Sequence, residues 1–212
     1  MDRRELLKMI AVVTGGTVIG GEFFLTGCKV ADKPAAGFTN DIISLLDEIG
    51  ETIIPATSTP GAKAAKVGDF MKVMVTDCYT EAQQSVFMNG TKTLIDACKK
   101  TTGRSFMDCT TTERHDFLVS LEKEAREFNK KRDDEDKKRK EEHEKSNKKL
   151  AWKDQEEFQG SPSHYYTMMK QLTLLGFFSS KTGMTETLRH LPVPGKYDGS
   201  VPYIKGEKAW AE

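Results

Sequence analysis

Side chains that could act as nucleophiles or metal ligands are sparse in this chain of 212 residues, which has four cysteines and four histidines. The cysteines form no Cys-x-x-Cys pair, and the histidines lack the spacing of a metal site. No dinucleotide-binding glycine motif and no phosphate-binding loop is present, and no serine or cysteine stands in a recognised motif of a nucleophile with its base. The sequence therefore predicts no catalytic residue, cofactor site or metal site here, although a triad assembled from distant segments stays an open alternative. Solvated or hydrogen-bonded roles are expected for the histidines, which are His115, His143, His164 and His190.

Cys28 is the cysteine with the most specific context. It follows Leu25-Thr26-Gly27, and this order of one apolar residue, two small residues and a cysteine resembles a bacterial lipobox. In such a motif the thiol takes a diacylglycerol, the chain is cleaved before the cysteine, and the new N-terminus is acylated. Stable anchoring in a membrane requires more than one acyl chain. We predict lipidation at Cys28 and a tether over residues 28–37; a chance cysteine or an uncleaved anchor is the alternative.

Two adjacent arginines, Arg3 and Arg4, lie in the opening sequence DRRELLK. This stretch resembles the twin-arginine export motif Ser-Arg-Arg-x-Phe-Leu-Lys, with Asp and Leu at two of its positions. The apolar run that follows is short and rich in glycine for a membrane span, which needs about 20 mainly apolar residues. We predict that residues 1–27 are a lipoprotein signal read by the twin-arginine translocase; a general secretion signal is the alternative. The mature chain would then be lipid-anchored on the periplasmic side of a bacterial membrane.

Three cysteines remain if Cys28 carries lipid, and the exported compartment permits disulfides. Cys98 and Cys109 flank the segment KKTTGRSFMD, which can fold back and bring its two ends together. These two residues are the candidate disulfide. Cys78 lies on an apolar helical segment and is expected to be a buried free thiol.

The balance of charge argues against nucleic acid as a partner, because Lys and Arg together number 32, as do Asp and Glu. Much of this charge lies in residues 129–149, NKKRDDEDKKRKEEHEKSNKK. Both signs are interleaved there, which cancels most of the basic field that nucleic acid or an anionic lipid would require. We predict a solvated insert, either a helical extension or a mobile loop, that contributes little to the core.

Apolar residues recur at three- and four-residue spacing through most of the remaining chain, and no convincing alternating strand is present. The pattern predicts an all-α, single-domain helical bundle over residues 38–212. Thr39 or Asn40 could cap the first helix, Thr80-Glu81 could open another, and Thr110-Thr111-Thr112-Glu113 has the hydroxyl and the glutamate of a capping region. The expected helices span residues 39–54, 66–79, 81–100, 111–140 and 162–178. The final sequence, LPVPGKYDGSVPYIKGEKAWAE, is rich in proline and glycine and predicts an extended strap.

The last predicted helix is apolar over most of its circumference and must therefore be covered on all sides. Two explanations stay open. The helix is the centre of the bundle, or part of it meets another chain together with the strap, because aromatic residues are enriched at interface centres. The candidate interface residues are Tyr165, Tyr166, Phe177, Phe178, Tyr197, Asp198, Tyr203 and Trp210.

Two stretches of the chain resemble the gluconate 2-dehydrogenase subunit 3 family. The first is GETIIPATSTPGAKAAKVGDF, and the second, which is more specific, is KQLTLLGFFSSKTGMTETLRHLPVPGKYDGSVPY. The resemblance extends over roughly residues 40–212 and is poorest in the charged stretch.

Membership of this family would imply a small helical subunit without a redox cofactor of its own. Its partner would be a large FAD-dependent flavoprotein of the glucose–methanol–choline type that oxidises a sugar or sugar acid, often with a cytochrome c subunit carrying haem c. The flavoprotein folds around FAD in the cytoplasm, so the small subunit would carry the export signal for both. The resemblance thus predicts a non-catalytic accessory and co-export subunit. The alternative is a free-standing envelope lipoprotein that acts as a binding or scaffolding module.

Overall fold

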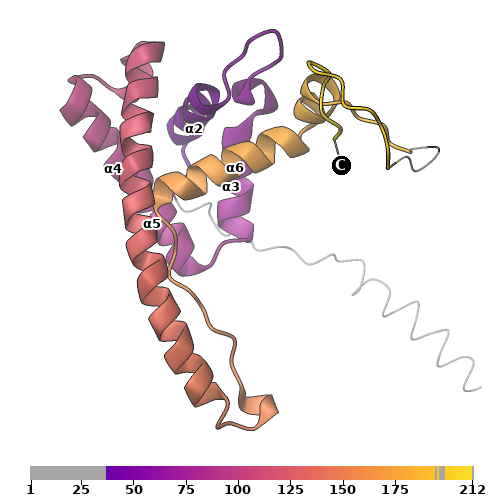
Figure 1. The fold of residues 1–212 in the computed structure, drawn as a ribbon. Helices are drawn as coiled ribbons and strands as arrows, with labels where there is room; N and C mark the ends of the chain where they lie inside the picture. Colours follow the sequence, from indigo (N-terminus) through magenta and orange to yellow (C-terminus); the bar gives the residue numbers. More distant parts are fainter. Residues whose placement is uncertain (1–36, 194, 196–198, 212) are drawn as a thin grey trace, which may run out of the picture. The chain divides into compact units, whose positions relative to one another are not determined.

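The computed structural model describes residues 37–193, 195 and 199–211. Predictions for Arg3, Arg4, Cys28, Tyr197 and Asp198 lie outside these residues and stay predictions. The described chain forms α-helices joined by loops and short turns, and it contains no β-strand (Figure 1), which confirms the predicted all-α fold. The helices are α2 (Asn40–Ile53), α3 (Val67–Asp77), α4 (Glu81–Thr102), α5 (Thr111–Asn147) and α6 (Tyr165–Ser179). The short turns are η1 (Ala62–Ala65), η2 (Phe106–Asp108), η3 (Trp152–Asp154) and η4 (Gly183–Thr187).

Three of these helices begin at a threonine whose hydroxyl accepts a backbone N–H of the first turn. Thr39 caps α2 in this way at 3.3 Å. Thr80 and Thr110 cap α4 and α5, each in a capping box with the side chain of Gln83 or Glu113. A side-chain cap of this kind stabilises a helix by about 1 kcal/mol. The predicted helix starts are confirmed, and the structure identifies Thr39, Thr80 and Thr110 as the capping residues.

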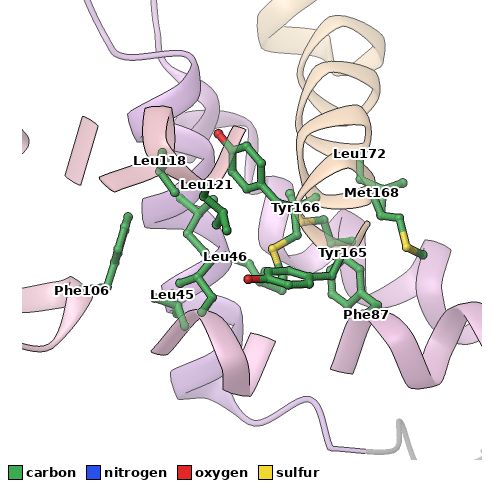
Figure 2. Packing of buried hydrophobic residues seen from close by; sticks show 14 of the residues in the cluster. Leu45, Leu46, Phe87, Phe106, Leu118, Leu121, Tyr165, Tyr166, Met168 and Leu172 are labelled. Carbon is green, nitrogen blue, oxygen red and sulfur yellow. The ribbon is translucent and has the colours of Figure 1, made fainter. Parts of the chain in front are cut away.

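The central helix is α6, which packs against α2, α3, α4 and α5. Side chains from several of these helices meet in one apolar cluster, shown in Figure 2. The helices α4 and α6 cross closely at Gly90, where a Cβ atom would lie only 2.1 Å from Cγ of Tyr165. Only glycine fits at this crossing. Of the two explanations for the apolar helix, a position at the centre of the bundle is confirmed for most of its length.

Acidic side chains of α2 hold the loop that follows the helix. Glu51 accepts the backbone N–H of Ala56 at 2.8 Å and that of Lys63 at 2.9 Å. Asp47 accepts the N–H of Gly68 at 2.7 Å, in the first turn of α3, where the helix dipole favours a negative charge. These hydrogen bonds fix the loop and connect α2 to α3, so the first family-like stretch, GETIIPATSTPGAKAAKVGDF, has a structural role.

The charged stretch is a helical extension, because α5 runs on to Asn147, beyond its predicted end at residue 140. At 37 residues, α5 is about 55 Å long. The chain then returns alongside α5 (Figure 1), where Asp136 accepts the backbone N–H of Ser161 at 2.6 Å and its hydroxyl at 2.9 Å. The mixed charges thus cover a solvated helix.

Two local predictions are corrected by the structure. The last helix begins at Tyr165 and not at residue 162, because Asp136 holds Ser161 and the N-cap is His164, whose Nδ1 accepts the N–H of Tyr166 at 3.3 Å. Cys78, which was expected to be buried, is exposed. It occupies the C-cap of α3, just after the last helical residue, and so lies beyond the buried face of that helix.

Candidate partner-binding surface

Three of the predicted interface aromatics belong to the core of the chain itself. Tyr165, Tyr166 and Phe177 are all buried. Burial disfavours the charged phenolate and raises the pKa of both tyrosines to about 12. Because the bundle encloses these three residues, they offer a partner almost no surface.

Phe178 lies on the opposite side of α6, together with Leu174 and Leu175. These side chains are 41%, 39% and 51% exposed, and their spacing of three and four residues places them on one face of the helix. The inner side of the same turn is closed, since a Cβ atom on Gly176 would lie 2.6 Å from the ring of Phe70 in α3. The bundle therefore covers one side of this turn and leaves an apolar side free. We call Leu174, Leu175 and Phe178 the outer face of α6.

The end of the chain folds back on the segment that follows α6. Arg189 and Trp210 form an isolated parallel bridge, in which Arg189 donates to Ala209 O at 2.8 Å and its carbonyl accepts from Ala211 N at 2.9 Å. The guanidinium carbon of Arg189 lies 3.9 Å from the centroid of the Trp210 ring, a cation–π contact worth roughly 0.5–1 kcal/mol at an exposed site. Arg189 also pairs with Glu207 at 3.2 Å. Trp210 is thus held by its own chain and remains half exposed.

The other large apolar side chains of the strap are not covered in this way. Tyr203, for example, is 89% exposed. Single exposed apolar residues are common, but a gathering of them marks an interaction site. The exposed set consists of Leu191, Val193, Val201, Tyr203 and Ile204. These residues and the outer face of α6 make up the candidate partner-binding surface, at the C-terminal end of the central helix (Figure 1).

A cleft of about 330 Å³ lies between α2, α5 and α6. Ile53, Val119 and Tyr166 contribute apolar surface to it, and Glu122 and Lys170 lie at its polar side with Oε2 and Nζ 2.9 Å apart. The hydrogen bond from Lys170 holds the pKa of Glu122 below its ordinary value. A carboxylate paired in this way is a poor general base, so the cleft offers no group suited to acid–base catalysis at Glu122.

Cys98 and Cys109 are brought together by the structure as free thiols, with their sulfur atoms 3.9 Å apart in the core. The hydroxyl of Thr102 lies 3.4 Å from the sulfur of Cys109. Burial raises the pKa of the Cys98 thiol, which lowers its thiolate fraction and its reactivity. Disulfide formation between the two stays a prediction.

Within the part of the chain that the structure describes, no group of three or more His, Cys, Asp and Glu side chains could hold a metal ion. Of the described helices, none combines the length and the apolar character needed to cross a membrane. The two features that stand out chemically are therefore the exposed apolar surface and the thiol pair.

Comparison with protein families gives one result. The family described as Gluconate 2-dehydrogenase subunit 3 matches residues 41–195, well over half of the chain. The chain belongs to this family. The matched region covers α2 to α6, η4 and the start of the strap, so the resemblance inferred from the sequence is confirmed. As a member of the gluconate 2-dehydrogenase subunit 3 family, the chain is an accessory type of subunit from a multi-subunit dehydrogenase. No curated protein and no solved structure matches the chain.

Phe178 was predicted from the sequence as an interface residue, but the exposure of Leu174 and Leu175 on the same helix was not predicted. The signal that could have separated them is Gly176. A glycine between two leucines and two phenylalanines marks the side on which another helix approaches closely, which leaves the opposite side exposed.

Proposed function

We propose that this chain is the non-catalytic accessory and co-export subunit of a periplasmic FAD-dependent dehydrogenase of the glucose–methanol–choline type, which oxidises a sugar or sugar acid. The observation that carries the proposal is the match of residues 41–195 to gluconate 2-dehydrogenase subunit 3. In this account FAD and substrate bind to the large subunit, and a cytochrome c subunit with haem c accepts the electrons. The chain itself contributes binding and delivery.

The candidate partner-binding surface supports this role. Leu174, Leu175 and Phe178 expose apolar area on a helix whose other side is fixed in the core. Removing apolar surface from water contributes about 25 cal/mol per Å², and a rigid aromatic anchor such as Phe178 loses little entropy on binding. We propose that the flavoprotein covers this face and the exposed side chains of the strap.

The signal at the start of the chain supports the delivery role. A flavoprotein has to fold around FAD in the cytoplasm, and the twin-arginine route is the one that carries folded proteins. Arg3 and Arg4 would direct the pair to that route, and lipid on Cys28 would hold it at the periplasmic side of a membrane.

Co-purification tests the proposal and the surface separately. The chain carries an affinity tag and is expressed with a flavoprotein of the glucose–methanol–choline type from the same genome, and the flavoprotein retained on the resin is measured. Wild type should retain the flavoprotein. Replacing Leu175 and Phe178 together by Ser should weaken binding about tenfold or more, because two apolar contacts at an interface centre are lost.

The matched control replaces Met107 and Val119 by Ser. Both side chains are about as exposed as the outer face of α6 but lie on η2 and α5, so retention should be unchanged. Thermal unfolding of each variant shows that the chain still folds. If wild type fails to retain the flavoprotein, the alternative of a free-standing scaffolding lipoprotein is favoured. If both double variants retain it equally, the proposed surface is wrong while the function stands.

A further inference from the structure

The second half of α5 and the chain that follows it form a two-limbed arm, visible beside the bundle in Figure 1. At Asn129 the arm is still bound to α6, through a side-chain hydrogen bond of 2.8 Å to Thr167. From there α5 continues to Asn147, a further length of about 27 Å. The amide of Asn147 donates to the carbonyl of Glu156 and accepts its N–H, which ties the two limbs together near their junction. We call residues 145–153, where the limbs join, the arm tip.

The arm tip concentrates positive charge. Its sequence, KSNKKLAWK, contains four lysines and no acidic residue, and acids resume only at Glu144 and Asp154 on its two sides. All four lysines are exposed, and no ion pair among the described residues involves any of them. They are Lys145, Lys148, Lys149 and Lys153. Residues 129–144 carry seven basic and seven acidic side chains, which cancel, whereas residues 145–153 carry a net charge of +4 at one end of the arm.

The same nine residues expose the most accessible tryptophan of the described chain. Trp152 is 85% exposed and Leu150 is half exposed, on either side of Ala151. The arm offers no core for these side chains, since none of the residues of η3 is buried. Tryptophan beside lysine is the composition of a membrane–water boundary, where the indole ring lies among headgroups and lysine contacts lipid phosphates.

We propose that the arm tip binds the surface of a membrane that contains anionic phospholipid. Lysines at such a surface each strengthen binding, and an inserted tryptophan adds apolar burial. The contact would be separate from any lipid on Cys28 and does not depend on the proposed function. An acidic protein surface or a nucleic acid would pair with the lysines but would not by its charge bury Trp152 and Leu150. A membrane surface accounts for both features, so it is the favoured partner.

Fluorescence of Trp152 tests the proposal in the full chain. The chain contains two tryptophans, so the variant Trp210→Phe leaves Trp152 as the single reporter. Vesicles of phosphatidylglycerol mixed with phosphatidylcholine should shift its emission to the blue, and vesicles of phosphatidylcholine alone should not. Raising the salt to about 1 M, where the screening length is about 3 Å, should abolish the shift. Attachment of the chain through its N-terminal segment would leave this signal unchanged, because that segment contains no tryptophan.

Two triple variants make the assignment specific. Replacing Lys148, Lys149 and Lys153 by Gln should raise the lipid concentration for half of the shift at least about tenfold. Replacing Lys137, Lys138 and Lys140 by Gln removes the same charge from the middle of the arm and should have a much smaller effect. The proposal is overturned if Trp152 shows no shift with anionic vesicles, if both triple variants bind equally, or if the shift occurs only with an acidic protein or a nucleic acid.

Discussion

The guanidinium of Arg114 lies 2.6 Å from the carboxylate of Glu48, which joins the first turn of α5 to α2 across 66 residues of sequence. The same arginine donates to the carbonyl oxygens of Phe106 at 2.9 Å and Met107 at 2.7 Å in η2. Glu48 also accepts a hydrogen bond of 2.6 Å from Lys63 in η1. Two ion pairs of Glu48 and two hydrogen bonds from Arg114 therefore join four elements, α2, η1, η2 and α5, at the edge of the core.

Removal of Arg114 should be costly for this reason. Arg114→Met leaves the largely buried Glu48 without its more buried partner and two carbonyls without donors, so we expect a loss of about 2–3 kcal/mol in the free energy of unfolding. Lys63→Met is the matched control and should cost less than about 1 kcal/mol, because Lys63 is mainly exposed. Urea denaturation at pH 7 measures both values. Equal losses in the two variants would contradict this role of Arg114.

Stability should fall in mild acid because of His164. Burial lowers the pKa of His164 below its ordinary value of 6.5, although the carboxylate of Glu124, 4.0 Å away, opposes the shift. As the pH falls below 6.5, the unfolded chain takes up a proton before the folded chain does, so stability present above that pH is lost progressively. His164→Asn keeps a side chain that can cap α6 but does not titrate. Thermal unfolding between pH 7 and pH 5 should show a shallower decline for His164→Asn, and identical declines would rule out this residue as the cause.

Cys98 and Cys109 should form a disulfide in an oxidising compartment. The two thiols give up two protons and two electrons to an added disulfide such as oxidised glutathione, which leaves as two thiols. Closing a loop of this length stabilises a protein by about 3 kcal/mol in the chain-entropy model. After oxidation, the variant Cys78→Ser should lose two free thiols and show a higher melting temperature in thermal unfolding. The variant Cys109→Ser cannot form the disulfide and should show neither change. A stable pair of thiols after complete unfolding and oxidative refolding would refute the pairing.

Export should depend on the pair Arg3 and Arg4. Replacing both by Lys preserves the charge, so a general secretion signal would still function, whereas a twin-arginine signal would not. We expect both this chain and the flavoprotein to be lost from the periplasmic fraction, measured by immunoblotting. Cytoplasmic amounts of both proteins serve as the control for expression. Unchanged export of both would end the co-export hypothesis.

Much of the fold could be predicted because its determinants are local. The helix starts at Thr80 and Thr110 follow from a hydroxyl and a partner three residues later, a pattern contained within one turn. The pairing of Glu48 with Arg114 depends on how distant segments meet, and no local pattern reports it.

The candidate site was predicted less well, for a related reason. The side of a helix that faces the core is normally recognised by its apolar stripe, and a helix that is apolar all round has no such stripe. The sequence therefore could not show that Phe177 faces the core while Phe178 faces outward. In the sequence, the lysines of the arm tip directly follow a stretch of mixed charge and do not stand out from it. They become a separate surface only where the chain turns back at residues 148–152.

The FAD content of the isolated complex tests the central claim most directly. The tagged wild-type chain is purified from the envelope of cells that also express the proposed flavoprotein partner, and flavin is measured by absorbance after denaturation. The account predicts one FAD for each copy of this chain in the complex, bound by the flavoprotein, and no FAD when this chain is purified alone. Absence of flavin from the envelope preparation, or FAD bound by this chain in isolation, would contradict the account.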